Sequence, residues 1–314
     1  MANIYEAIKY FKTIDGVEIE YADLEGDGPT LLFIPGYSLA TDLVLPALSK
    51  LQDQFRVITL TLRGFGGANP TKAKGTPAEG EVSLSQAARD VKALIDYLNL
   101  DECIVMGYSM GTHVAFSYIE QFGCDRISKL IILDMTPKLI NDETWNLGLY
   151  QGHYTTERAL YDLNIMKDNY NKGFNEYFFH QAAMPHTRDE KRDYIFTEKM
   201  KDDIEDYAKW YNIPGLTADI LMYVPPKNWP VYRTYWREMC KHDFRPLLAK
   251  IDVPTGIFYA DPGSIYDVET AKYLNCNIKN SKLYPIKDAV HTSLITYSTK
   301  ETFEQLLYFT NDFK

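Results

Sequence analysis

The chain has 314 residues, of which 46% are hydrophobic and 24% are charged, and its formal net charge is −10. This balance is typical of a globular protein with a core of good size, and the acidic charge disfavours nucleic acid and anionic membrane surfaces as partners. No stretch approaches the ~18 uninterrupted apolar residues of a membrane span, and the N-terminus lacks the apolar run of a signal peptide, so we expect a cytoplasmic location.

A hairpin opens the chain, and an alternation of strands and helices follows it. Residues 8–23 predict the hairpin because two strand-like runs flank Asp15-Gly16, a two-residue turn signal. Short apolar runs that end at turn residues then predict buried strands. These expected strands are residues 30–36, 55–62, 103–108 and 129–135.

The clearest helix covers residues 83–98, where apolar side chains recur on one face. Ser83 and Gln86 have the form of a capping box at its start. Further helical patterns follow the strand at 30–36 and the strand at 103–108. Because strands alternate with helices, we expect an α/β fold with a mostly parallel sheet and helices on both faces.

The alternation breaks after Pro137 and resumes near residue 246. Residues 138–245 show helical and irregular patterns without a clear strand, and all four tryptophans lie there. We therefore expect a core domain formed by 1–137 and 246–314, with 138–245 inserted into it as a helical subdomain. The later part of the core predicts strands at 253–261 and 281–286, a helix at 266–274 and a final helix from about 299.

A serine stands between two glycines at the end of the expected strand 103–108. The stretch from Gly107 to Gly111 fits G-x-S-x-G, with Ser109 at its centre. A buried strand before the motif and an amphipathic helix after it are the context of a nucleophile elbow, whose sharp turn exposes the serine hydroxyl. The alternative is a glycine turn in which the serine only caps the helix.

With this motif the sequence resembles the α/β-hydrolase superfamily, over nearly all the chain outside 138–245. "FIPGYS" resembles the family's oxyanion loop, "GYSMG" its nucleophile elbow and "DAVHTSL" its late histidine loop. "TLRGFGGANP" resembles the loop after the family's fourth strand, with Thr61 and Asn69 in place of the usual Asp and Ser. The resemblance implies that the insertion at 138–245 is the family's helical cap, or lid.

The resemblance also implies a general base for Ser109, since a serine hydroxyl is a weak nucleophile without one. His291 follows the last apolar strand and matches the position of the family's base. His113 lies one turn beyond Ser109 on the same helix, which favours a structural role. The remaining histidines lie in or beside the insertion, where they could line a substrate pocket; they are His153, His180, His186 and His242.

The acid that orients the base has more than one candidate. In the usual family position, beyond the seventh strand, this chain has Gly263. Some haloalkane dehalogenases and epoxide hydrolases, which share this fold, carry the acid after the sixth strand instead, and Asp134 occupies that place. We favour Asp134 and keep Asp261 as the alternative, with Asp267, or no acid at all, as the third possibility.

The family's oxyanion hole is formed by two backbone N–H groups that face the developing negative charge. The resemblance places one donor at Met110, directly after the nucleophile. It places the other at Tyr37, where Gly36 allows a close backbone approach.

Together these features predict a serine hydrolase that cleaves a small or medium, largely apolar ester or lactone, with no cofactor. Four scattered cysteines without paired spacing predict neither a metal site nor disulfides. The expected partner is a small-molecule substrate, and the oligomeric state stays open, a homodimer included. The alternatives are haloperoxidase-like, C–C hydrolase or acyltransferase chemistry on the same residues, or a small-molecule receptor with a slow triad.

Overall fold

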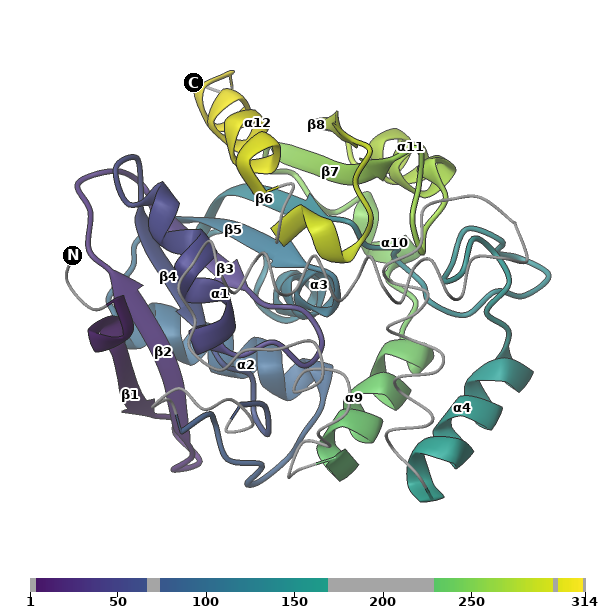
Figure 1. The fold of residues 1–314 in the computed structure, drawn as a ribbon, viewed down its shortest axis with the longest axis horizontal. Coiled ribbons are helices and arrows are strands. Elements are labelled where there is room, and N and C mark those ends of the chain that lie inside the picture. Colours follow the sequence, from purple (N-terminus) through teal and green to yellow (C-terminus); the bar gives the residue numbers. More distant parts are fainter. Residues whose placement is uncertain (1–3, 67–73, 169–228, 296–298, 313–314) are drawn as a thin grey trace.

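The computed structural model describes residues 4–66, 74–168, 229–295 and 299–312. Eight strands form one sheet in the order β1-β2-β4-β3-β5-β6-β7-β8 (Figure 1). Strand β2 pairs antiparallel with β1 and β4, and every later pairing is parallel. The strands are β1 (Ile8–Lys12), β2 (Glu18–Leu24), β3 (Thr30–Ile34), β4 (Arg56–Leu60), β5 (Cys103–Tyr108), β6 (Ile127–Leu133), β7 (Thr255–Asp261) and β8 (Ser281–Lys287).

Helices cover both faces of the sheet (Figure 1). Consecutive strand residues point to opposite faces of the sheet. In β3, Leu31 and Phe33 therefore pack on the face that α1 and α12 cover. Leu32 and Ile34 pack on the other face, with α2, α3 and α11. The near-continuous apolar runs of the central strands follow from burial on both sides. These helices are α1 (Thr41–Leu48), α2 (Leu84–Tyr97), α3 (Met110–Phe122), α11 (Val268–Asn277) and α12 (Thr299–Asp312).

Two local predictions differ from the structure in detail. The opening hairpin forms, but its connection runs from Thr13 to Val17, because the last strand pair is Lys12 with Glu18. The capping box of α2 is only half formed. The Ser83 hydroxyl accepts from the Gln86 backbone N–H, whereas the Gln86 side chain is drawn to the carboxylate of Asp90.

The insertion leaves the core after β6 and returns before β7. Its described parts include α4 (Thr156–Asp168) and α9 (Trp229–Lys241), which lie side by side (Figure 1), followed by the short α10 (Arg245–Leu248). Residues 169–228 lie outside the described residues, so the helical cap over 138–245 stays a prediction. Within the described segments, no helix is both long and apolar enough to cross a membrane.

A buried ion cluster joins the hairpin, the loop after β4 and α2. The Arg63 guanidinium is fully buried and donates two hydrogen bonds to Asp90 (2.6 and 2.7 Å) and two to Asp15 (2.6 and 2.9 Å). Burial raises the pKa of Asp90, and the Arg63 hydrogen bonds oppose that rise. The cluster fixes the loop after β4 on the sheet.

Replacing Arg63 with Met is expected to destabilise the fold strongly. The change leaves the Asp90 carboxylate buried without its cation, and we expect a loss of about 3–5 kcal/mol in the free energy of unfolding, measured by urea denaturation. The control is Lys92→Met, which breaks an exposed pair with Asp96 and should cost about 1 kcal/mol or less. Equal losses in the two variants would contradict the role given to the cluster.

Candidate active site

Ser109 stands on a sharp turn between β5 and α3. Its backbone has φ 52° and ψ −125°, a conformation that non-glycine residues rarely adopt. The flanking glycines are required by close packing: a Cβ at Gly111 would lie 2.0 Å from the Ile34 carbonyl oxygen, and one at Gly107 would lie 2.6 Å from Thr112 Cα. The strand–turn–helix context is that of a nucleophile elbow.

The Ser109 hydroxyl is bonded to a histidine. Its Oγ lies 2.9 Å from His291 Nε2, and His291 Nδ1 lies 2.6 Å from Asp134 Oδ2. In the described part of the chain Ser109 makes no capping bond to α3, so the alternative of a merely capping serine is wrong. With Nδ1–H donating to the carboxylate, Nε2 is free to accept the serine proton; this tautomer is assigned from the hydrogen-bond geometry.

The three side chains follow strands that end at the same edge of the sheet. Ser109 follows β5, Asp134 follows the adjacent β6, and His291 follows β8, all at the carboxyl edge where open α/β sheets place their sites. All three are buried, with 6% or less of each exposed. The sheet order thus brings together groups that are 157 and 182 residues apart along the chain.

Two tyrosines hold the His291 ring. Tyr108 stacks on it at 5.2 Å and donates its hydroxyl to the His291 carbonyl at 2.9 Å. Tyr266 meets the ring edge to face at 5.8 Å and bonds the Met135 sulfur. Burial, and secondly the Asp134 carboxylate, raise the pKa of both phenols well above the ordinary value, so both stay neutral.

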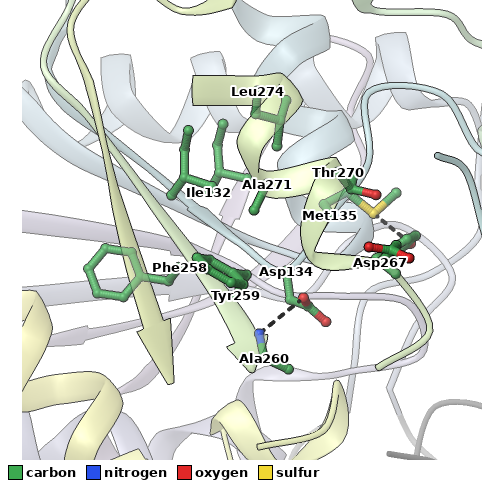
Figure 2. A pocket seen from close by; sticks show the side chains of 12 residues that line it. Ile132, Asp134, Met135, Phe258, Tyr259, Ala260, Asp267, Thr270, Ala271 and Leu274 are labelled. Carbon is green, nitrogen blue, oxygen red and sulfur yellow. Dashed lines mark hydrogen bonds between the residues drawn. The ribbon is translucent and has the colours of Figure 1, made fainter. Parts of the chain in front are cut away.

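Asp134 is held by β7 and by the loop that follows it. The backbone N–H of Asp134 donates to the Phe258 carbonyl at 2.8 Å. Its carboxylate lies beside Ala260 (Figure 2), whose N–H is 3.4 Å from Asp134 Oδ1. The Ser264 hydroxyl donates to Oδ2 at 3.0 Å.

A small pocket lies between the Asp134 carboxylate and α11 (Figure 2). It is lined mainly by apolar side chains, among them Ile132, Met135, Tyr259, Ala271 and Leu274.

The other two acid candidates lie elsewhere. Asp261 is the last residue of β7 and forms no described bond with His291. Asp267 is the N-cap of α11 and accepts from the Glu269 N–H. Among the three candidates, only Asp134 bonds the imidazole in the part of the chain that the structure describes.

The other histidines that the structure describes do not join this constellation. His113 is fully buried on α3, and its Nε2 lies 2.8 Å from the Thr136 carbonyl oxygen. His242 bonds the Glu238 carbonyl at the end of α9, and His153 lies exposed at the start of the insertion. His180 and His186 lie outside the described residues.

The predicted oxyanion loop lies against the serine. A Cβ added at Gly36 would be 3.1 Å from Ser109 Cβ and 2.9 Å from the Tyr108 ring, so the loop approaches as closely as glycine permits. The Tyr37 hydroxyl donates to the Tyr232 carbonyl at 2.8 Å, which ties the loop to α9. Met110 begins α3, where the first N–H groups have no partner within the helix.

Among the residues that the structure describes, acidic, cysteine and histidine side chains do not gather into a metal site. No group of three or more such residues that could hold an ion occurs among the residues described above. The hydrogen bonds at Ser109 bring together side chains that can serve as a nucleophile, a base and an acid.

Comparison with known proteins identifies the family. A model of the alpha/beta hydrolase fold matches residues 29–296. The chain belongs to this family. It is 25% identical over 95% of its length to an AB hydrolase superfamily protein, YisY, of Bacillus subtilis, covering 97% of that protein. The match confirms the fold and family expected from the sequence and supports the expectation of a hydrolase.

Solved structures share the fold of this alpha/beta hydrolase. An esterase from Exiguobacterium antarcticum superposes with a TM-score of 0.73 at 18% identity, covering 96% of this chain and 99% of the esterase. A bromoperoxidase from Bacillus anthracis gives the same TM-score at 24% identity, with 97% and 99% covered. These similarities establish the architecture and leave the reaction to be argued from the site.

Two contacts at the site were not anticipated from the sequence. The hydroxyls of Tyr108 and Ser264 bond the His291 carbonyl and the Asp134 carboxylate. Tyr108 carries a weak signal, since it lies inside the G-x-S-x-G motif. Ser264 carries none beyond its place next to Gly263, where the family's usual acid is missing.

The buried His113 is expected to make stability depend on pH. Burial lowers the pKa of His113 to about 3, so between about pH 6.5 and that value only the unfolded chain takes up a proton at this imidazole. The free energy of unfolding should therefore fall as the pH drops below about 6.5, by about 1.4 kcal/mol per pH unit from this group. His113→Gln should lose that component, as urea denaturation at two pH values would show. Identical pH slopes in variant and wild type would contradict the assignment.

Proposed function

We propose that the protein is a serine hydrolase that cleaves a small or medium, largely apolar ester or lactone. One observation carries the proposal: the buried, hydrogen-bonded path from Asp134 through His291 to Ser109. A serine on a strained turn, paired with an oriented imidazole, is the arrangement that activates a hydroxyl for attack on an acyl carbon.

The contacts support a role for each group in acyl transfer. His291 Nε2 accepts the proton as Ser109 Oγ attacks the carbonyl carbon, and it then protonates the leaving alkoxide. Asp134 keeps Nδ1 protonated and stabilises the imidazolium that forms between these steps. A water molecule, deprotonated by the same Nε2, next attacks the acyl-enzyme and releases the acid, so that Ser109 regains its proton.

The oxyanion that forms in each step needs backbone donors. We assign this role to the N–H groups of Tyr37 and Met110. The close approach of Gly36 to Ser109 supports the first assignment, and the start of α3 at Met110 supports the second. A helix N-terminus also favours negative charge through its dipole.

Aromatic side chains beside the oxyanion loop favour an apolar substrate. The ring of Tyr37 packs edge to face with Phe65 (5.8 Å), Tyr232 (5.8 Å) and Trp236 (5.5 Å). The last two come from α9, so the insertion contributes to this cluster. Burial raises the pKa of Tyr232 above its ordinary value, which keeps that phenol neutral and the cluster without charge. We therefore expect an uncharged substrate in which an apolar group flanks the scissile ester.

A second candidate uses the same side chains with a different second nucleophile. The bromoperoxidase among the structural neighbours favours keeping a haloperoxidase-like reaction, in which hydrogen peroxide replaces water. An acyltransferase would use an alcohol or amine at the same step, and a C–C hydrolase would break a carbon–carbon bond. The receptor alternative is disfavoured, because Ser109 and His291 are already hydrogen-bonded as a reactive pair.

The decisive test is the reactivity of Ser109. A fluorophosphonate probe should form one adduct on Ser109, located by mass spectrometry, and p-nitrophenyl acetate and butyrate should be hydrolysed. Ser109→Ala and His291→Ala should abolish both readouts. Asp134→Asn should lower kcat by about 10⁴-fold, because the amide favours the wrong tautomer of the imidazole.

Asp261→Asn is the matched control, since it removes a carboxylate at the neighbouring strand end without touching His291. It should leave kcat near that of the wild type. Esterase activity that survives in Ser109→Ala, or a loss that follows Asp261 and not Asp134, would contradict the proposed mechanism.

Gly36→Ala tests the oxyanion loop. The added methyl group would crowd the Tyr108 ring and Ser109 Cβ, so the loop and the ring must move apart, and we expect the N–H donor of the loop to be displaced. We expect kcat to fall by about 10²-fold, in the range found when one oxyanion donor is lost. Thermal unfolding reports whether the fold is kept. A variant with unchanged kcat would place the oxyanion donor elsewhere.

A further inference from the structure

The loop after β7 supplies a hydroxyl where the family's usual acid is absent. Ser264 is buried, with 3% of it exposed, and its Oγ lies 3.0 Å from Asp134 Oδ2. The same oxygen accepts the His291 Nδ1–H at 2.6 Å. We propose that Ser264 is a positioning residue for the Asp134–His291 pair, an inference that rests on the proposed function.

The carboxylate depends on Ser264 because its other contact is weak. The Ala260 N–H lies 3.4 Å from Asp134 Oδ1, a distance near the limit of a hydrogen bond. Within the described residues, the Ser264 hydroxyl is thus the one close donor besides the imidazole. A hydrogen bond to a buried carboxylate stabilises its charge and fixes its orientation. Ser264 therefore directs Oδ2 toward His291.

The insertion holds Ser264 in place. The Gln151 side chain donates to the Ser264 carbonyl at 2.6 Å, and the Gln151 N–H donates to the Ile265 carbonyl at 3.1 Å. Tyr150 and Gln151 both have positive φ values, 53° and 52°, and Gly152 follows with 88°. Such backbone persists only where its surroundings determine it. The turn at residues 150–152 of the insertion is thereby connected to the acid through Ser264.

The proposal predicts a particular change in the pH profile. When His291 is neutral, the pair carries a net negative charge, and when His291 is protonated, the pair is neutral overall. A donor at Oδ2 stabilises the negative state more than the neutral one. Losing the hydroxyl should shift the acidic limb of kcat/KM to higher pH.

Other ionisable groups near the pair do not produce this shift. Tyr108 and Tyr266 face the imidazole and stay neutral in this range, because burial raises the pKa of each. Asp267 lines the pocket beside Asp134, and its carboxylate caps α11. The Ser264 replacement leaves all three of these side chains present, so we expect the shift to report the missing hydroxyl.

The test measures kcat/KM against pH for p-nitrophenyl butyrate in Ser264→Ala. We expect the acidic limb to move up by about half to one pH unit and kcat/KM at neutral pH to fall about tenfold, as for the loss of a hydrogen bond to a charged group. Ser264→Cys keeps nearly the same shape with only a weak donor, so it should change in the same direction even if the alanine variant folds poorly.

Ser117→Ala is the control. It removes a fully buried hydroxyl on α3 instead of the one on the loop after β7, and it should leave the acidic limb of kcat/KM unmoved. An unmoved acidic limb with unchanged kcat/KM in both Ser264 variants would overturn this proposal alone. Wild-type protein that neither reacts with fluorophosphonate nor hydrolyses the ester would instead overturn the proposed function, and this inference with it.

Discussion

The hydrogen-bonded path from Asp134 through His291 to Ser109 is the constraint on which the rest of the site depends. Its two bonds, 2.6 and 2.9 Å, require three strand ends to meet at one edge of the sheet. A buried carboxylate and imidazole are costly to desolvate unless they are paired, so the site is stable only when all of its partners are in place. The surrounding Tyr108, Tyr266 and Ser264 contacts satisfy that condition.

The fold supplies this meeting point through sheet order and tight turns. β5 and β6 are neighbours in the sheet although α3 lies between them in the chain, and β7 and β8 follow in order beyond them (Figure 1). Gly111 lets α3 lie directly against the end of β3, and Gly107 lets β5 lie directly against the start of α3; a Cβ at either position would collide with backbone atoms. The cost of the positive φ at Ser109 is thus offset by packing, and the strain stays at the proposed nucleophile.

Much of this arrangement is readable from the sequence, and the remainder depends on side-chain directions. Buried strands show as continuous apolar runs, and the elbow shows as glycines around Ser109. The acid was ambiguous because Asp134 and Asp261 both end neighbouring strands, and a sequence does not reveal which carboxylate turns toward His291. The half-formed capping box at Ser83 shows the same limit, since the Gln86 side chain is drawn to the buried carboxylate of Asp90.

The most direct test of the account is to trap the acyl-enzyme during turnover. Wild-type protein would be mixed with p-nitrophenyl acetate, quenched in acid within the first turnovers and digested for peptide mass spectrometry. The account predicts a burst of p-nitrophenol and an acetyl group on Ser109. Turnover with no burst and no acetylated peptide, or acetylation at another residue, would contradict it.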